Sequence, residues 1–553
     1  MKKLISFILI ITISLSCLLA GGCKKEEPQG AKEEKINYVD PMKDIEVKNS
    51  TDKYRNFYQI FVGSFCDSNN DGIGDLQGII SKLDYLNDGD NSTNTDLGVD
   101  GIWLTPIMPS RSYHKYDVKD YFNIDEQFGT LKDFDMLIEE CHKRGIKVII
   151  DMVLNHCSNY FPLFENACKE ALQGNLNGDA KYFEIDCYEE NPGSSYTEIG
   201  DGYYYISNFS PHMPEWDLNA QCTRDYFIDI AKFWINEHNV DGFRLDALKY
   251  FDDMDTDGKE FLKWYYEAVK EIKPDVYMVG EHWVGNIEIY DMYNTKIDSL
   301  FAFEFAGAAG EFIRSVRLET ANTFVTELQK YYRNTKETNK DSINAFFLSN
   351  HDQIRSGNSL KGDTPSDTKM AAAAYMLVPG NSFIYYGEEI GMVQDSQADG
   401  DEYKREPMVW DKTSPPTMLV NGTTGYDETQ VPYGGVKQQQ EDENSILNYY
   451  KRVIKIKNQN PEIARGEIAE AVDFEDKNIL AFNIEYKGSK VMIIHNLSSK
   501  EDKEINLENV IENPVIRGDL VASNFEGTNK YISLEGNVLK MPTQSTVVLK
   551  TAE

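Results

Sequence analysis

The sequence predicts an α/β protein whose main domain is an eight-stranded parallel barrel, the (β/α)8 TIM barrel, with two smaller attachments. Short apolar segments with strand character alternate with segments whose apolar residues recur at helical spacing. The eight strand segments are FYQIF (57–61), GIWL (101–104), KVIID (147–151), GFRLD (242–246), VYMVGE (276–281), FAFEF (301–305), NAFFLSN (344–350) and SFIYYGEE (382–389). Because such alternation is typical of parallel sheets, eight repeats favour a closed barrel over an open sheet.

Two regions break the alternation and predict the attachments. About 70 residues rich in Tyr, Asn and Gly separate the third strand from the next helix, too many for a simple loop in a compact fold. Residues 156–215 are therefore expected to form a small inserted domain. Short alternating runs separated by Lys-Gly-Ser and Glu-Gly-Asn turns predict a C-terminal antiparallel β-sandwich domain over 464–553. The barrel then comprises residues 53–155 and 216–463.

The N-terminus has the features of an exported bacterial lipoprotein. Two lysines precede an apolar run over 4–19, which is shorter than the roughly 20 residues of a membrane-spanning helix and indicates a signal peptide over 1–22. The stretch LLAGGCKKEE resembles a lipobox, which implies lipid modification of Cys23, and a flexible tether follows over 23–52. We therefore expect a protein outside the cytoplasm, anchored by lipid to the bacterial cell membrane. The alternative is an ordinary secretory signal with an incidental cysteine.

Composition and charge limit the classes of partner. Apolar residues make up 41% of the 553 residues and aromatic residues 12%, which predicts a globular chain. The 56 basic against 91 acidic residues give a net charge of -35, which argues against nucleic acid or anionic lipid as a partner and favours a neutral ligand. Beyond Cys23 six cysteines remain without CxxC spacing, so we predict no zinc site and leave disulfides and free thiols as alternatives. A monomer is the working assumption.

Polar residues follow several of the predicted strands at their C-terminal ends, where barrels carry their functional groups. They are His156, Asp246, Glu281, His351 and Asp352. Because these ends meet at one rim, we expect the three carboxylates to converge.

Three carboxylates on one rim suit the cleavage of a glycosidic bond, which needs one ionised and one protonated carboxyl group. Arg244 shares a strand face with Asp246, so it is expected to lower the pKa of Asp246 and to keep this residue ionised as the nucleophile. Like charge around Glu281 is expected to raise its pKa, which suits a general acid that later acts as the base.

Four segments resemble, in order, the four motifs of the α-amylase superfamily, glycoside hydrolase family 13. They are DMVLNH (151–156), GFRLDALKY (242–250), GEHW (280–283) and FLSNHD (347–352), with REPMVW as a further match. The resemblance covers the chain from about Tyr54 onward and implies a retaining hydrolase of α-glucans such as starch and maltooligosaccharides.

The resemblance also implies roles for individual residues. Asp246 would be the nucleophile, Glu281 the acid/base, and Asp352 the carboxylate that binds and distorts the sugar in the first subsite. The residues expected to bind substrate around these three are Tyr116, His114, His156, Arg244, Lys249, Trp283 and His351.

The stretch DSNNDGIGD (67–75) predicts a calcium loop. Its oxygen ligands recur at alternating positions, which suits a hard cation, and would come from Asp67, Asn69, Asp71, the Ile73 carbonyl and Asp75. It is not an EF-hand, because the twelfth position is Gly78 instead of a glutamate. It resembles the calcium loop after the first strand of oligo-1,6-glucosidase-like members of the superfamily.

Linkage specificity is less constrained. Ala247 and Lys249 favour an endo-acting α-amylase that cuts α-1,4 links. The alternative is an α-glucosidase, an oligo-1,6-glucosidase or a neopullulanase-like enzyme of mixed α-1,4/α-1,6 specificity. MPEWDLN (213–219) differs by a one-residue insertion from the motif of the intermediate subgroup. A third hypothesis is a catalytically silent surface glycan-binding protein, against which the complete set of three carboxylates argues.

Overall fold

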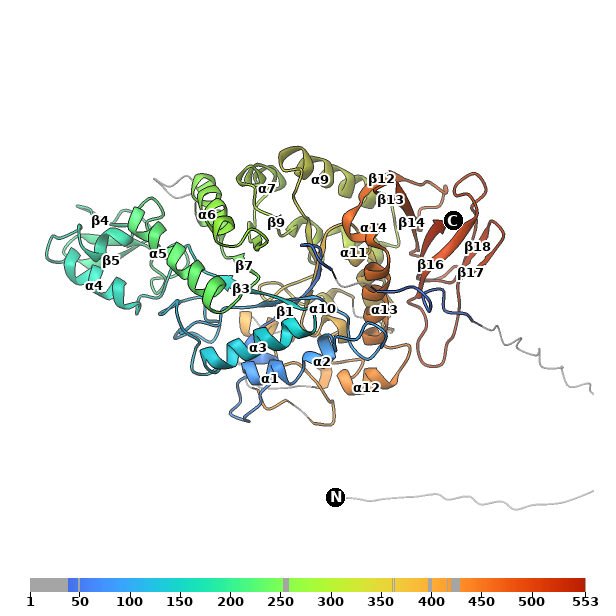
Figure 1. Cartoon of the computed structure of the whole chain (residues 1–553), viewed down its shortest axis with the longest axis horizontal. Coiled ribbons are helices and arrows are strands. Elements are labelled where there is room, and N and C mark those ends of the chain that lie inside the picture. Colours follow the sequence, from blue (N-terminus) through green and yellow to red (C-terminus); the bar gives the residue numbers. More distant parts are fainter. Residues whose placement is uncertain are drawn as a thin grey trace, which may run out of the picture. The chain divides into compact units, whose positions relative to one another are not determined.

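Eight parallel strands form the central barrel (Figure 1). In the computed structural model they are β1 (Asn56–Ile60), β2 (Gly101–Leu104), β3 (Lys147–Met152), β7 (Gly242–Leu245), β8 (Tyr277–Gly280), β9 (Ser299–Leu300), β10 (Ala345–Phe347) and β11 (Asn381–Tyr385). Neighbouring strands pair in parallel, and β11 pairs with β1. A parallel bridge between Phe301 and Ala345 joins the end of β9 to β10. The predicted barrel is confirmed.

The structure describes residues 38–47, 50–251, 258–360, 362, 364–395, 400–414, 416–418 and 428–552. The predicted signal peptide, Cys23 and most of the predicted tether lie outside these residues. Pro41 onward forms one unit, separate from residues 1–40. Within the described ranges no helix is long and apolar enough to cross a membrane. The six cysteines between Cys66 and Cys222 are all free thiols.

One predicted strand is displaced along the chain. The apolar run FAFEF was expected to be a strand, but the strand that pairs with β8 is Ser299–Leu300. Phe303–Phe305 instead forms a 3-10 turn. Its apolar side chains are still buried, because Phe303 joins the cluster inside the barrel and Phe305 joins the larger core.

Helices between the strands cover the outside of the barrel. They are α1 (Leu76–Ile80), α2 (Leu83–Leu86), α3 (Leu131–Lys143), α5 (Gln221–Lys232), α6 (Gly258–Ile272), α7 (Asn286–Met292), α8 (Glu311–Leu318), α9 (Phe324–Thr338), α10 (Ser356–Leu360), α11 (Ser366–Met376), α12 (Val436–Glu441), α13 (Ile446–Gln459) and α14 (Pro461–Arg465). Thr130 and Asp133 form a capping box that fixes the start of α3.

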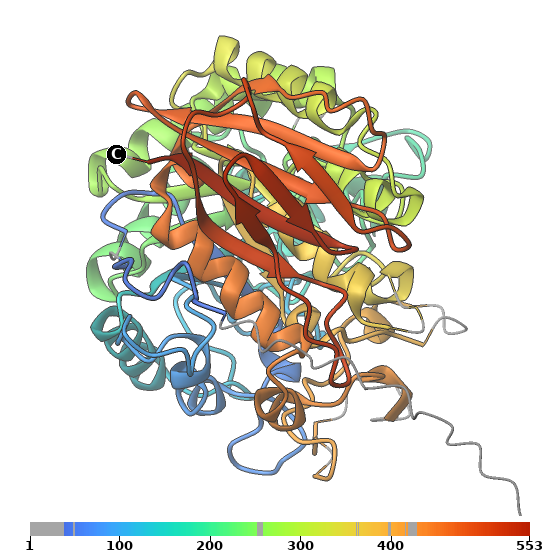
Figure 2. The same ribbon diagram turned by 90° about the vertical axis from the view of Figure 1, so that its right-hand side faces the viewer.

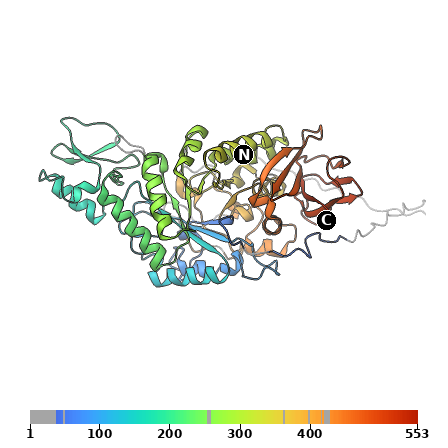
Figure 3. The same ribbon diagram turned by 45° about the horizontal axis from the view of Figure 1, so that its top comes forward.

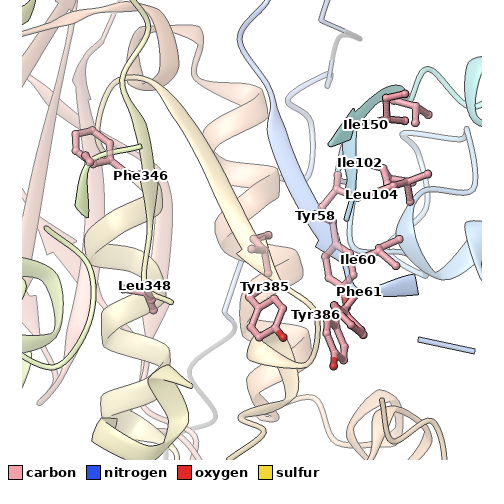
Figure 4. Packing of buried hydrophobic residues seen from close by; sticks show 14 of the residues in the cluster. Tyr58, Ile60, Phe61, Ile102, Leu104, Ile150, Phe346, Leu348, Tyr385 and Tyr386 are labelled. Atoms are coloured by element: carbon pink, nitrogen blue, oxygen red, sulfur yellow. The ribbon is translucent and has the colours of Figure 1, made fainter. Parts of the chain in front are cut away.

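The inside of the barrel changes from apolar to polar along the strands. Phe57 and Ile149 belong to a buried cluster within the barrel, and Gln59 and Asp151 follow two residues later on the same strand faces. The alternate residues, such as Ile60 and Leu104, belong to the larger core shared with the helices (Figure 4). On these strands polar groups are thus presented at the C-terminal rim.

The two attachments lie on opposite sides of the barrel (Figures 1 and 3). Between β3 and β7 the chain forms α4 (Pro162–Ala171) and a sheet in the order β4-β6-β5, made of Ile185–Cys187, Tyr203–Ile206 and Tyr196–Gly200. After α14 it forms two antiparallel sheets, which Figure 2 shows facing the viewer.

The C-terminal sheets contain eight strands. The five-stranded sheet has the order β12 (Glu467–Ala471), β13 (Ile479–Tyr486), β14 (Ser489–Asn496), β19 (Ser545–Thr551) and β16 (Pro514–Val521); the three-stranded sheet has the order β15 (Lys503–Asn506), β18 (Val538–Met541) and β17 (Ser533–Glu535). Ile494, Leu539 and Val547 share one buried cluster that joins the two sheets, which gives a sandwich with its own core.

Candidate active site

Arg244 occupies the centre of the polar rim. Its side chain is fully buried on β7, because residue 244 points into the barrel while its neighbours in the strand point outward. One terminal nitrogen, Nη1, donates to Asp246 at 2.5 Å and to Asp151 at 2.8 Å, and the other, Nη2, donates to Glu281 at 2.6 Å. One guanidinium therefore holds three carboxyl groups from three adjacent strands.

Burial governs the protonation of this cluster. It raises the pKa of Asp246 to about 6, and Arg244 only partly offsets this effect. Burial also raises the pKa of Glu281 to about 7, with Arg244 opposing and Asp246 and Asp352 adding to the rise. The expected rise for Glu281 is found, with burial as a larger cause than like charge. The expected net lowering for Asp246 is wrong, because desolvation outweighs the arginine.

Asp352 is held in a different environment. Its carboxylate contacts Arg405 at 2.9 Å and His351 at 3.1 Å. Burial acts to raise the pKa of Asp352, but His351, Arg405 and Arg244 together outweigh it and keep the pKa below the usual range. Asp352 is therefore the carboxyl group of the site that stays ionised to the lowest pH.

A cavity of about 350 Å³ opens above these groups. Eight predicted residues line it: His114, Tyr116, His156, Asp246, Lys249, Glu281, Trp283 and Asp352. The other two, Arg244 and His351, lie beneath it and are fully buried. The structure thus brings together all ten residues expected to be catalytic or to bind substrate.

The histidines and Tyr116, which lie in or beneath the cavity, are neutral hydrogen-bonding groups. Burial lowers the pKa of His156 and of His351 to about 3. His156 Nε2 is buried and has no hydrogen-bond partner in the described part of the chain. The ring of Tyr116 stacks on His351 with 5.6 Å between centroids, and its hydroxyl group is 2.7 Å from His351 Nε2. These side chains suit binding of uncharged hydroxyl groups.

Ala247, directly after Asp246, has a left-handed backbone with φ of 54°. This conformation is costly for a residue other than glycine. It directs the Ala247 N–H to Glu281 Oε2 at 3.3 Å. A strained backbone at this point therefore supplies a second donor to the carboxyl group of Glu281.

Several residues of the site were not predicted. Asp151 begins the first motif and forms the ion pair with Arg244, and its place on the inward face of β3 was a usable signal. Arg405 lies within REPMVW, but no spacing rule links it to Asp352. Phe209 and Met213 also line the cavity and gave no signal, because they lie between β6 and α5, outside the barrel strands. Tyr250 lines it too and ends the 3-10 turn after β7, within the second motif, so its position was a usable signal.

The predicted calcium loop is a tight turn held by its own carboxylates. Asp67 accepts the N–H groups of Asn70 and Gly72 at 2.7 and 2.9 Å, and Thr417 donates to it at 2.7 Å. Asp75 caps α1 by accepting the Gly78 N–H at 2.7 Å.

Ligands for calcium would have to come from carboxylate, amide and carbonyl oxygens of this loop together. Across the described residues, no three His, Cys, Asp or Glu side chains are grouped as a metal site. Amide and carbonyl oxygens, such as those of Asn69 and Ile73, would therefore complete the set, which consists of oxygens only and suits Ca²⁺.

Comparison with known proteins identifies the family. A model of the α-amylase catalytic domain matches residues 59–466, well over half of the chain. The chain belongs to the α-amylase family. It is thus a glycoside hydrolase of family 13, as its four motifs imply.

Relatives of this α-amylase family member carry several names. Alpha-amylase 3 of Dictyoglomus thermophilum is 36% identical over 456 residues, which cover 81% of this chain and 86% of that protein. A cyclomaltodextrinase of Thermoanaerobacter pseudethanolicus is 29% identical (86% and 71% covered), and an oligo-1,6-glucosidase of Bacillus cereus is 28% identical (80% and 90% covered). Among solved structures, Eubacterium rectale Amy13B has a TM-score of 0.82 and 37% identity, with 92% of this chain and 97% of that chain covered.

Proposed function

We propose that the protein is a retaining, endo-acting α-amylase that hydrolyses α-1,4 bonds in starch and maltooligosaccharides. The observation that carries this proposal is the binding of Asp246 and Glu281 to the two terminal nitrogens of one guanidinium, at 2.5 and 2.6 Å. The carboxyl groups therefore lie side by side. Retaining glycosidases keep about 5–5.5 Å between these groups, whereas inverting enzymes leave about 6.5–9.5 Å for a water molecule.

Two displacements at the anomeric carbon then account for cleavage. The Asp246 carboxylate attacks this carbon while its bond to the leaving oxygen breaks, and Glu281 transfers its proton to that oxygen. In the second step Glu281 takes a proton from water, whose oxygen attacks the anomeric carbon and releases Asp246. Two inversions retain the α configuration. Arg244 stays bound beneath both groups, and the ionised Asp352 with Arg405 suits the binding of sugar hydroxyls.

Polymer cleavage is supported by aromatic side chains at the cavity. Trp283 and Phe209 line it and are both substantially exposed, so sugar units beyond the cleaved bond can stack on them. The relative at 36% identity, which is named Alpha-amylase 3, supports the α-amylase reading. The relatives named cyclomaltodextrinase and oligo-1,6-glucosidase support mixed or α-1,6 specificity as the second candidate.

A time course of products from soluble starch, pullulan, isomaltose and cyclodextrin tests the proposal. We expect rapid shortening of starch to mixed maltooligosaccharides of α configuration, with Asp246→Asn inactive. Glucose as the only early product would contradict endo action. Faster cleavage of isomaltose or cyclodextrin than of starch would favour the second candidate, and full activity of Asp246→Asn would remove Asp246 as nucleophile.

We further propose that the loop over 67–75 binds Ca²⁺ and that Cys23 carries a lipid anchor. The alternating oxygen donors of the loop support the first proposal. The apolar N-terminal run followed by small residues and Cys23 supports the second. An anchored exoenzyme suits a polymer that cannot enter the cell. Labelling with a radioactive fatty acid, with Cys23→Ser as control, tests the anchor, and unlabelled wild type would contradict it.

A further inference from the structure

Three consecutive carbonyl groups around Arg405 each accept a hydrogen bond from a side-chain hydroxyl group. Tyr385 donates to the carbonyl before Arg405 at 2.9 Å, Ser64 donates to the carbonyl of Arg405 itself at 2.6 Å, and Tyr386 donates to the carbonyl after it at 2.6 Å. We call these three hydroxyl groups the hydroxyl clamp. Consecutive carbonyls held in this way leave the backbone of Arg405 little freedom to turn.

The hydroxyl clamp is fixed to the barrel itself. Ser64 lies in the 3-10 turn Val62–Ser64 after β1, and Tyr385 is the last residue of β11, with Tyr386 directly after it. β1 and β11 pair side by side, and all three clamp side chains are buried. Figure 4 labels both tyrosines at the end of the strand. The Ser64 carbonyl also accepts the N–H of Met408 at 2.8 Å, a second tie to the same segment.

The side chain of Arg405 points from this segment to the active site. Its Nη2 contacts Asp352 at 2.9 Å, its Nε donates to the His351 carbonyl at 3.0 Å, and its Nη1 donates to the Tyr113 hydroxyl at 2.9 Å. Arg405 belongs to a loop segment rather than to a barrel strand. Strand pairing therefore does not fix the position of Arg405 relative to Asp352. The hydroxyl clamp provides this constraint instead.

Arg355 connects the loop of Asp352 to the two tyrosines of the clamp. It lies three residues after Asp352, and its Nη1 donates to the Tyr386 carbonyl at 2.7 Å. Its guanidinium lies 4.5 Å from the ring centre of Tyr385 and 4.7 Å from that of Tyr386. The loop that carries Asp352 and the loop that carries Arg405 therefore both contact the same two tyrosines, Tyr385 and Tyr386.

We propose that Ser64, Tyr385 and Tyr386 are positioning residues that hold Arg405 against Asp352 and so set the geometry of sugar binding in the cavity. None of the three lines the cavity, so they act through Arg405 and not on the substrate. This inference rests on the proposed function, because it assigns sugar binding to Asp352 and Arg405.

A double-mutant cycle on starch tests the proposal. Tyr386→Phe and Tyr385→Phe each remove one hydroxyl group and keep the ring, and Ser64→Ala provides a variant of a smaller residue in case a tyrosine change prevents folding. We expect kcat/KM to fall about tenfold in each, a size typical of small displacements of binding groups. The matched control is Tyr375→Phe, which loses a buried hydroxyl group bonded to Glu388 outside the clamp and should keep its kcat/KM.

The deciding measurement repeats Tyr386→Phe in an Arg405→Ala background. If Tyr386 acts through Arg405, its removal has no further effect there, because the group it positions is already absent. Equal losses in both backgrounds, or wild-type kcat/KM in all three clamp variants, would overturn the proposal. Asp352→Asn separates the two levels. If Asp352→Asn is inactive while the clamp variants have wild-type kcat/KM, only the proposal about the clamp is overturned. If Asp352→Asn is fully active, the proposed function is overturned.

Discussion

Arg244 and Asp151 form an ion pair in which both side chains are completely buried, with 2.8 Å between Nη1 and Oδ1. The two residues are directly opposite each other in the register of β3 and β7. Asp151 also accepts from Trp103 Nε1 at 3.2 Å and from the Tyr116 hydroxyl at 3.0 Å. Asp151 thus supports Asp246 and Glu281, since it orients the arginine that bonds to both.

Asp151→Asn should impair both stability and turnover. Loss of one partner of a buried ion pair typically lowers the free energy of unfolding by about 3 kcal/mol or more. A shifted Arg244 should lower kcat/KM roughly a hundredfold. Urea unfolding and starch kinetics measure the two effects. Asp229→Asn, in an exposed pair with Lys232, is the control and should change stability by less than about 1 kcal/mol. A change as small as this in Asp151→Asn would contradict the role of the pair.

Activity should depend on pH in a bell shape with a maximum between about 6 and 7. In the proposed mechanism Asp246 must be ionised to attack, so its pKa of about 6 sets the rise on the acid side. Glu281 must be protonated to donate, and its pKa of about 7 sets the fall on the alkaline side. Because the two groups share Arg244, the measured values belong to the pair. A profile of kcat/KM against pH checks this, and full activity near pH 9 would contradict it.

Glu388→Gln should flatten the dependence of stability on pH. Glu388 is buried, accepts from Tyr375 and Tyr450 at 2.8 and 3.0 Å, and burial raises its pKa to about 8. The folded state therefore keeps a proton that the unfolded chain loses near pH 4, so stability falls as pH rises from there to about 8. Each unit of pKa difference corresponds to about 1.4 kcal/mol.

Urea unfolding of wild type and Glu388→Gln at pH 5 and pH 9 measures the contribution of Glu388 to the pH dependence of stability. Glutamine keeps an acceptor for the tyrosines but cannot ionise, so the variant should lose less stability between the two values. Glu526→Gln, at an exposed position, serves as control. Parallel losses in wild type and Glu388→Gln would show that Glu388 does not retain its proton.

Trp283→Ala should weaken starch binding with little effect on the fold. Its ring is 44% exposed, lines the cavity and stacks on Phe303 with 4.7 Å between centroids. Loss of one aromatic contact with a sugar, worth about 1.4 kcal/mol, raises KM about tenfold. Tyr531→Ala removes an exposed ring of the C-terminal domain and is the matched control. An unchanged KM for starch in Trp283→Ala would exclude this platform.

Chelation should lower thermal stability more than it changes the chemistry, because the loop over 67–75 gives no side chain to the catalytic cluster. A site saturated a hundredfold above its Kd adds about 2.7 kcal/mol to the free energy of unfolding. Melting temperatures with Ca²⁺ and with excess EDTA measure this difference in wild type and in Asp71→Ala. The variant should not respond to either addition. Identical responses of both proteins would contradict the site.

Strand-end carboxylates were predictable from sequence because a local rule places them. Asp246 and Glu281 each directly follow an apolar strand, and parallel strands bring these ends to one rim. Arg405 and Phe209 obey no such rule. Their positions depend on contacts between loops far apart in the chain, as with Arg405 and Asp352, which are 53 positions apart.

Two errors have the same physical origin. The strand assigned to 301–305 lies at Ser299–Leu300, because pairing with the neighbouring β8, and not apolarity, decides which residues extend. The net pKa of Asp246 was misjudged because a sequence shows the nearby arginine but not the depth of burial. Strand pairing and depth of burial are both set only when the barrel is assembled, so neither can be read from a local segment of the sequence.

The left-handed backbone of Ala247 limits how this enzyme can evolve. The position directly after Asp246 must hold φ near 54° to keep its N–H on Glu281. A β-branched residue would be the most strained there, whereas glycine would adopt the conformation freely. New substrate preferences are therefore more accessible through Phe209 and Trp283, which line the cavity from other parts of the chain and whose replacement leaves the backbone beside Asp246 untouched.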